Sequence, residues 1–304
     1  MCVRVALAGV GNCASALVQG LYYYRSASKS ATPATVRQRF AGYDLADIEV
    51  VAAFDVDPQK VGIDLSEAIF APANCAAVVH RPPKSGVVVA RGPLLDGLTP
   101  RIRKRLGVSN DEISDTVYAV LTDSRADVLV ILLPSGAQAA THRYVEAALA
   151  AGIGIVNAIP VNIANNHEIA MRATEAKVPI IGDDIKSQIG ATIVHKAIAE
   201  LFPLRSALLK RTIQLDWAGD SDFENLVSEQ RYELGKRASK THPIIWNQPN
   251  RDEIEKYASL RSTTSGSCGT KRRLLSASRA LCSGTCQFGS NLVFRFLMHS
   301  TRRV

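Results

Sequence analysis

A glycine-rich turn near the amino terminus is the clearest chemical signal in the sequence. Gly9-Val-Gly11-Asn-Cys-Ala14 follows an apolar run and fits the spacing G-x-G-x-x-A. In this pattern the first glycine makes a tight turn, the second lets the backbone approach a pyrophosphate, and the small third residue permits close helix packing. Backbone N–H groups at the start of the next helix face the phosphate charge. The motif predicts a dinucleotide site; its alternative is a turn that serves packing only.

Three aspartates follow the second apolar run: Asp55, Asp57 and Asp64. An acid at the end of the second strand normally accepts hydrogen bonds from the adenosine ribose, about 20 residues after the glycine motif. Here the interval is longer because a polar segment, residues 25–41, is inserted. Any of the three could meet the ribose; we favour Asp55 and Asp64, and expect at least one of the three to be a solvated turn carboxylate. An acid disfavours a 2′-phosphate, so NAD is preferred over NADP.

A basic cluster, Gly235-Lys-Arg-Ala-Ser-Lys240, could bind an anion. Its four-residue spacing places Lys236 and Lys240 on one face if the segment is helical. Two ammonium groups held this close can flank an anionic substrate. The alternative is a solvated basic patch, which the spacing by itself favours.

The elements that must position these residues alternate regularly. Continuous apolar strands separated by helices are typical of a parallel sheet covered on both faces. The predicted fold class is α/β: a Rossmann-like doubly wound parallel sheet with ligands at the carboxyl ends of its strands, followed by a second, mixed α+β domain that looks truncated. The strands are expected at residues 3–7, 49–55, 87–90, 127–134, 153–158 and 178–182.

Three parts are expected along the chain: a nucleotide-binding domain over 1–200, the start of a second, mixed domain over 201–257, and an aberrant tail over 258–304. The tail has eight Lys or Arg and no Asp or Glu, which leaves 28 basic and 28 acidic residues in 1–257. The net charge of +8 therefore belongs to the tail. Binding of the tail to a nucleic acid stays open but is disfavoured.

Cysteine usage gives no sign of a disulfide framework in the first part of the chain. In the tail, Cys268, Cys282, Cys286 and His299 could in principle ligate zinc, although chance in a Cys- and Ser-rich segment is the favoured explanation. No metal ligand set is expected in residues 1–257. No apolar run reaches the ~18 residues of a membrane helix, and the first strand begins too early for a signal peptide. A cytoplasmic location is the default expectation, with no membrane partner.

Four sequence elements occur together in a characteristic order: Gly9–Ser15, Ala52–Asp57 with Lys60-Val-Gly62, Arg91–Gly97, and Gly182–Gln188 with Gly190-Ala-Thr192. The Gly-Asp-Asp-x-Lys-Ser element in the last of them is the most distinctive. Through these elements the chain resembles the inositol-1-phosphate synthase family, in its actinobacterial form, over residues 1–257. The resemblance implies that residues 201–257 begin a catalytic and tetramerisation domain.

The resemblance implies a homotetramer that binds NAD tightly and converts glucose 6-phosphate to 1D-myo-inositol 3-phosphate, the first step of inositol and inositol-phospholipid synthesis. The implied cycle is redox-neutral: oxidation at C5, enolisation, aldol closure of C1 onto C6, and reduction by the same NADH. Cationic side chains would stabilise the phosphate, enolate and alkoxide charges. Some relatives also hold a mono- or divalent cation near the nicotinamide.

The resemblance also assigns roles to individual residues. Lys236, Lys240 and Lys186 are the expected catalytic residues, although Lys186 points either into the site or toward solvent. For Tyr144, packing of its helix is an equally good explanation. The expected cofactor-binding residues are Gly9, Gly11, Asn12, Cys13, Asp55, Asp64, Tyr144, Asp183, Ser187 and Asp222.

Beyond Tyr257 the family pattern is not recognisable, and Lys271 matches none of the family's later lysines. We hypothesise that residues 258–304 translate a shifted reading frame, which resequencing of the gene would test. The second domain would then lack most of its sheet, so weakened NAD binding and loss of synthase activity are expected. The competing functions are a catalytically inactive remnant, a regulatory NAD-binding protein, and another Rossmann sugar dehydrogenase.

Overall fold

The structure is a computed structural model that describes residues 2–26, 39–108, 116–185, 190–218, 239–255, 259–264 and 291–298. It divides into two compact units, Met1–Ile185 and Lys186–Val304. The first unit ends before residue 200, where the sequence analysis placed the boundary, because the helix α7 (Ala191–Leu204) packs on a strand of the second unit.

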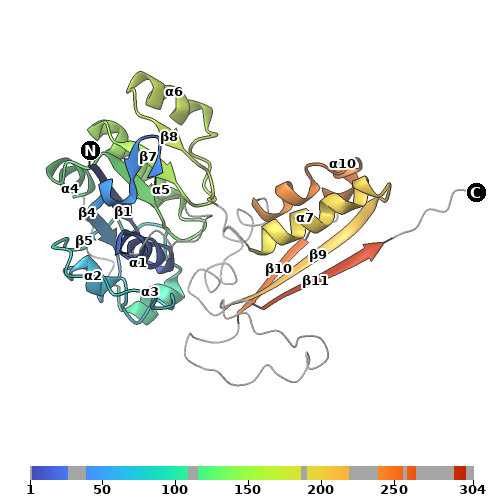
Figure 1. Cartoon of the computed structure of the whole chain (residues 1–304), viewed down its shortest axis with the longest axis horizontal. Coiled ribbons are helices and arrows are strands. Elements are labelled where there is room, and N and C mark those ends of the chain that lie inside the picture. The colour runs from blue at the N-terminus through green and yellow to red at the C-terminus, as the bar shows by residue number, and fades with distance from the viewer. Residues whose placement is uncertain are drawn as a thin grey trace, which may run out of the picture. The chain divides into compact units, whose positions relative to one another are not determined.

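The first unit is built on a six-stranded sheet with the order β5-β4-β1-β6-β7-β8, in which every neighbouring pair is parallel. Counted along the chain, this is the order 3-2-1-4-5-6 of the doubly wound dinucleotide-binding fold. Figure 1 shows these strands with helices around them. The strands are β1 (Val3–Ala8), β4 (Ile48–Asp55), β5 (Ala90–Arg91), β6 (Val128–Ile131), β7 (Gly154–Asn157) and β8 (Ile180–Ile181).

Two hydrophobic cores form because side chains alternate across each strand. In β1, Val5 and Leu7 join a core with Val18, while Ala6 and Ala8 join the opposite core. The sheet is therefore buried on both faces, as the continuous apolar runs predicted. The helices of this unit are α1 (Asn12–Ser26), α2 (Leu65–Ala68), α3 (Pro100–Leu106), α4 (Val117–Asp123), α5 (Gln138–Ala151) and α6 (His167–Glu175).

The predicted strand at 87–90 differs from the structure, where only Ala90 and Arg91 pair with β4. The preceding valines bond instead to the turn that follows β4: Gly62 N–H donates to Val89 O at 2.9 Å, and Leu65 N–H to Val87 O at 2.8 Å. The apolar run is thus used by a local pairing outside the sheet. A short hairpin, β2 (Arg39–Phe40) with β3 (Tyr43–Asp44), and the 3₁₀ turn η1 (Leu45–Asp47) precede β4.

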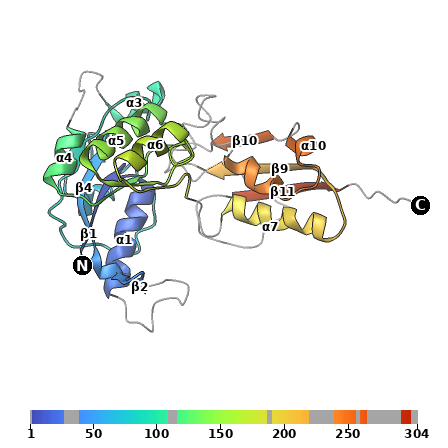
Figure 2. The ribbon, with the colours of Figure 1, turned by 90° about the horizontal axis from the view of Figure 1, so that it is seen from above.

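The second unit contains a three-stranded sheet with the order β10-β9-β11. Its strands are β9 (Leu209–Ala218), β10 (Ser259–Thr264) and β11 (Asn291–Met298). The helix α7 lies alongside β9 (Figures 1 and 2). Residues 239–245 are also helical, and α10 (Arg251–Glu255) follows them.

Two of these strands, β10 and β11, lie inside residues 258–304, the part that the sequence analysis described as an aberrant tail. β10 pairs with β9 in parallel and β11 pairs with it in antiparallel register. Among the described residues, no helix is long and apolar enough to cross a membrane.

Candidate functional site

The glycine turn lies where the strand order reverses, between β1 and β6. Gly9 has a φ of +98°, and a Cβ at this position would approach the carbonyl oxygen of Leu132 to 2.8 Å. Its N–H donates to Phe54 O at 2.8 Å. Only glycine fits this position, because its backbone is left-handed and is squeezed between the ends of the two neighbouring strands.

Gly11 serves a different purpose, because a Cβ there would meet nothing within 4 Å. Its carbonyl accepts the first hydrogen bond of α1, from Ser15 N–H at 2.9 Å. The space next to this helix start is open, and unsatisfied N–H groups of a 15-residue helix begin there. This is the cradle that a pyrophosphate requires, so the residues present fit a dinucleotide. Cys13 is exposed in the first turn of the same helix.

The side chain of Asp55 links the end of β4 to the glycine turn. Oδ2 accepts from Val10 N–H at 2.8 Å, while Oδ1 accepts from the N–H groups of Val56 and Asp57 at 2.8 and 2.9 Å. Lys60 Nζ lies 3.5 Å from Oδ2. A carboxylate has about four acceptor positions, and hydrogen bonds from the chain itself fill three of them. Asp55 lies where the sequence predicted it, and it orders the turn.

Asp57 and Lys60 follow Asp55 in the chain, and both side chains are buried. Asp57 is 2% exposed and Lys60 is 5% exposed. Lys60 Nζ lies 3.9 Å from Asp57 Oδ2, an oxygen that accepts no hydrogen bond from any residue that the structure describes. Burial raises the pKa of Asp57, against the opposing effects of the Gln59 N–H and the Lys60 charge. The sequence analysis did not single out Lys60 for chemistry, because nothing in its spacing shows that it is buried.

The carboxylate of Asp64 already accepts several hydrogen bonds from the chain itself. Its carboxylate accepts from the N–H and Oγ of both Ser66 and Ser85 and from Gly86 N–H, at 2.6 to 3.1 Å. Desolvation raises the pKa of Asp64, but the bonds from Ser66 and Ser85 outweigh it and hold the pKa well below its ordinary value. The geometry gives Asp64 a structural task, as cap of α2 and anchor of the 85–86 turn; its ribose role stays a prediction.

A segment without regular secondary structure, residues 74–80, lies beside the glycine turn and α1. Asn12 Oδ1 accepts from the N–H groups of Cys75 and Ala76 at 2.7 and 3.0 Å. Asn74 Nδ2 donates to Val10 O at 3.0 Å. The predicted cofactor residue Asn12 therefore fixes a wall of the site.

Further along this segment, the buried Gln19 accepts from the N–H groups of Val79 and His80 at 2.8 and 3.1 Å. Its amide also donates to Ala77 O at 3.2 Å.

Tyr144 is buried in the core, 2% exposed, with its ring 5.6 Å from that of Phe54 in an edge-to-face contact. Burial, with a smaller effect of the Asp55 charge, raises the pKa of its hydroxyl. A methyl group at Gly92 would overlap this hydroxyl. Tyr144 thus packs beneath the site, which agrees with its packing alternative.

Asp96, which the sequence analysis noted only within a motif, accepts from Ala139 and Ala140 N–H at 2.8 and 3.0 Å. It caps α5, whose own N-cap residue, Ala137, has no capping side chain.

Asp183 organises the opposite side of the sheet edge. It accepts from Asn157 Nδ2 at 2.7 Å and from the N–H groups of Ile163 and Ala164 at 3.0 Å. Asn165 donates two further bonds, from its N–H and its Nδ2. The carboxylate therefore shapes the loop that follows β7, at the carboxyl end where the sequence placed it.

Four predicted site residues, Lys186, Ser187, Asp222 and Lys236, lie outside the described residues. Lys240 is described; it lies in the helical stretch 239–245 of the second unit. No group of three or more His, Cys, Asp or Glu side chains is placed to hold a metal in the part of the chain that the structure describes.

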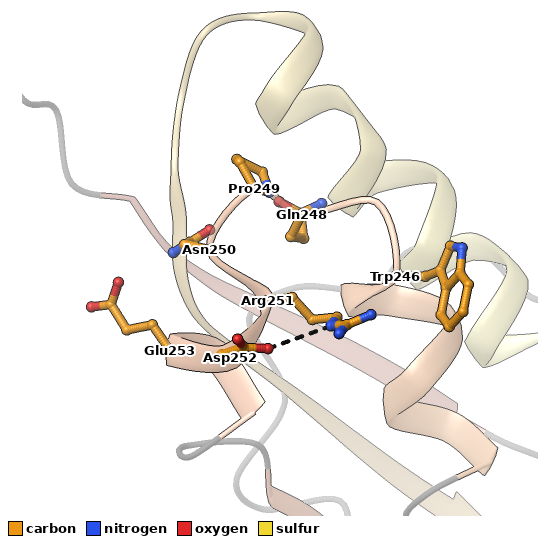
Figure 3. A pocket seen from close by; sticks show the side chains of 7 residues that line it. All are labelled: Trp246, Gln248, Pro249, Asn250, Arg251, Asp252 and Glu253. Carbon is orange, nitrogen blue, oxygen red and sulfur yellow. Dashed lines mark ion pairs between the residues drawn. The ribbon is translucent and has the colours of Figure 1, made fainter.

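A pocket of about 310 Å³ lies in the second unit, lined by Trp246 and by residues 248–253 (Figure 3). The Arg251 guanidinium lies 5.7 Å from the centre of the Trp246 ring, and its Nε lies 3.5 Å from Asp252 Oδ1. Gln248 Nε2 donates to Ala199 O at 2.8 Å, and Asn250 Nδ2 to Leu209 O at 3.0 Å. These amides fasten the segment to α7 and β9, and none of the predicted site residues lines the pocket.

Comparison with known proteins agrees with this architecture. The family model for myo-inositol-1-phosphate synthase matches residues 190–259. The chain is 48% identical over 249 residues to inositol-3-phosphate synthase of Corynebacterium glutamicum, and 46% identical over 246 residues to that of Mycobacterium tuberculosis. These matches cover 82% and 81% of this chain and 68% and 66% of the relatives. The chain thus spans about two thirds of the length of these relatives.

Among solved structures, that of Ari2 matches with a TM-score of 0.66 at 30% identity, covering 88% of this chain and 72% of that one. A myo-inositol-1-phosphate synthase-related protein from Thermotoga maritima matches with a TM-score of 0.61 at 22% identity, covering 88% and 74%, and supports the fold. The glycine turn, the strand order and the close actinobacterial relatives lead to one assignment: the chain belongs to the inositol-3-phosphate synthase family.

Proposed function

We propose that this chain binds NAD at the carboxyl edge of its six-stranded sheet and isomerises glucose 6-phosphate to 1D-myo-inositol 3-phosphate. The observation that carries the proposal is the glycine turn at the reversal of strand order, with Asp55 bonded to it. The relatives named inositol-3-phosphate synthase support the reaction, since they match 82% of this chain at 48% identity.

In this proposal, the N–H groups at the start of α1 hold the pyrophosphate, because the space beside Gly11 is open. Asp55 keeps the turn in place through Val10. Asp183 shapes the loop after β7, at the side of the sheet where a nicotinamide lies in doubly wound folds. NAD, when bound, supplies the removal and the return of one hydride.

The substrate chemistry requires cations, because a phosphate dianion is bound and enolate and alkoxide charges develop during the reaction. Ammonium groups directed at those oxygens stabilise the charges and can carry protons. We assign this task to Lys240, Lys236 and Lys186, of which Lys240 lies within the described residues. A homotetramer and a cation near the nicotinamide complete the proposal; light scattering tests the first, and assays with added chelator test the second.

The test is an assay of the purified chain with glucose 6-phosphate and NAD, followed by phosphorus NMR and by NADH absorbance. The proposal expects inositol phosphate without net accumulation of NADH, because the hydride is returned. Steady NADH release would instead indicate a sugar dehydrogenase. The absence of product from a chain that binds NAD would indicate an NAD-binding protein without turnover, the loss of activity expected from the tail.

A further inference from the structure

Lys60 is an unusual lysine, because it is 5% exposed next to the glycine turn. Lysine is almost never buried unless it is paired. Its Nζ lies 3.5 Å from Asp55 Oδ2 and 3.9 Å from Asp57 Oδ2. The backbone prepares this position, since the N–H of Lys60 donates to Asp57 O at 2.9 Å in the turn after β4. We name these three side chains the Asp55–Asp57–Lys60 cluster.

The cluster bears directly on the dinucleotide motif. The oxygen of Asp55 that faces Lys60 is the same Oδ2 that accepts from Val10, between the two glycines. At this distance the ammonium attracts the carboxylate oxygen and helps to hold it in place. Lys60 therefore acts on the glycine turn indirectly, through the Asp55 carboxylate that accepts the hydrogen bond from Val10.

The charges of the cluster do not cancel. With all three groups ionised, two carboxylates and one ammonium leave one negative charge, and the three side chains are 11% exposed or less. Buried charges are screened less by solvent and salt than exposed ones. This charge lies at the end of the second strand, where the fold places the adenosine ribose. A hydroxyl is tolerated there, whereas a phosphate dianion is repelled.

We propose that Lys60 is a positioning residue for the glycine turn, and that the Asp55–Asp57–Lys60 cluster sets the preference for NAD over NADP through its net negative charge. This inference rests on the proposed NAD site. The Lys60 ammonium is committed to two carboxylates and does not serve a 2′-phosphate, even though it lies near the expected ribose position. The selectivity thus belongs to three residues rather than to a single acid.

The experiment uses the full chain and fluorescence titration with NADH and with NADPH. Asp57→Asn removes one negative charge, keeps the acceptor for Gln59 N–H, and is expected to lower the ratio of the NADPH to the NADH dissociation constant about tenfold. Lys60→Met leaves two carboxylates without their cation; it is expected to weaken NADH binding and to raise the ratio by about the same factor. Lys60→Arg keeps the charge and is expected to restore the ratio.

Lys177→Met is the matched control, because Lys177 is exposed and precedes β8, at the opposite edge of the sheet. It makes the same chemical change and is expected to leave the ratio unaltered. Equal weakening of NADH and NADPH binding in both cluster variants would overturn the inference, since a purely structural role changes both affinities together. If Lys60→Met does not fold, Asp57→Asn alone decides. A wild-type chain that binds neither nucleotide would overturn the proposed function as well.

Discussion

Carboxylates lie at two places along the carboxyl edge of the six-stranded sheet, one beside β4 and one beside β7, and they are held in different ways. On the β4 side, Asp55 and Asp57 share a buried lysine, and the arrangement depends on charge. On the β7 side, the bonds that Asp183 accepts from the described residues all come from neutral amides, and the arrangement depends on hydrogen-bond geometry. Replacing residues on the first side should therefore change which nucleotide binds, and replacing Asp183 should change whether the loop holds its shape.

Gly9 joins the two sides, so its replacement is the most severe test of the comparison. In Gly9→Ala the new Cβ would approach Leu132 O to 2.8 Å at a φ of +98°. We expect loss of NAD binding and a destabilisation of at least about 1–3 kcal/mol from backbone strain alone. Thermal unfolding and NADH titration measure both. Gly20→Ala, inside α1 with open space around it, should instead stabilise by about 0.5–1 kcal/mol.

Asp183→Asn tests the hydrogen-bonded side. Asparagine keeps one acceptor oxygen, so part of the bonding to Ile163, Ala164 and Asn165 is lost. Because each unsatisfied buried group costs about 1–3 kcal/mol, we expect a destabilisation of that order, with an unchanged ratio of NADPH to NADH affinity. A change of this ratio would show that the two sides are not separate.

Gly11→Ala tests nucleotide binding separately from the stability of the fold. Because a Cβ at Gly11 meets no protein atom within 4 Å, the unfolding temperature should stay within about 2 °C of wild type. The methyl group would occupy space beside the pyrophosphate cradle, so NADH affinity should fall about tenfold or more. Unchanged affinity would mean that the pyrophosphate does not approach α1 here.

The smallest expected effect concerns acid stability at Asp64. Its pKa is lower in the folded chain than the ordinary carboxylate value of about 4, so the ionised form stabilises the fold above that value. This stabilisation is lost as the pH falls below about 4. Asp64→Asn should therefore show a shallower decline of the unfolding temperature between about pH 5 and pH 3. Parallel curves for the two proteins would contradict this role.

Local patterns were sufficient to predict the sheet and the glycine turn. The strand runs, the spacing of Gly9 and Gly11, and the position of Asp55 are all encoded within a few neighbouring residues. The sequence could not show how Asp64 is saturated, since its partners Ser85 and Gly86 lie 21 and 22 residues away.

The sequence also could not show that Lys60 is buried or that Asp96 caps α5, because their partners are not recognisable from local spacing. Each depends on a contact that exists only once the sheet has assembled. The length of a strand is equally non-local: residues 87–89 are apolar, yet they pair with the turn after β4 instead of extending β5.

The segment of residues 74–80 has a consequence for how copies of the chain behave together. Val78 and Val79 are 55% and 68% exposed, and unpaired backbone groups beside exposed apolar side chains can pair with a strand from another molecule. Gln19 engages the N–H groups of Val79 and His80 and the carbonyl of Ala77. A buried glutamine thereby occupies three backbone groups that a strand from another molecule would need for pairing.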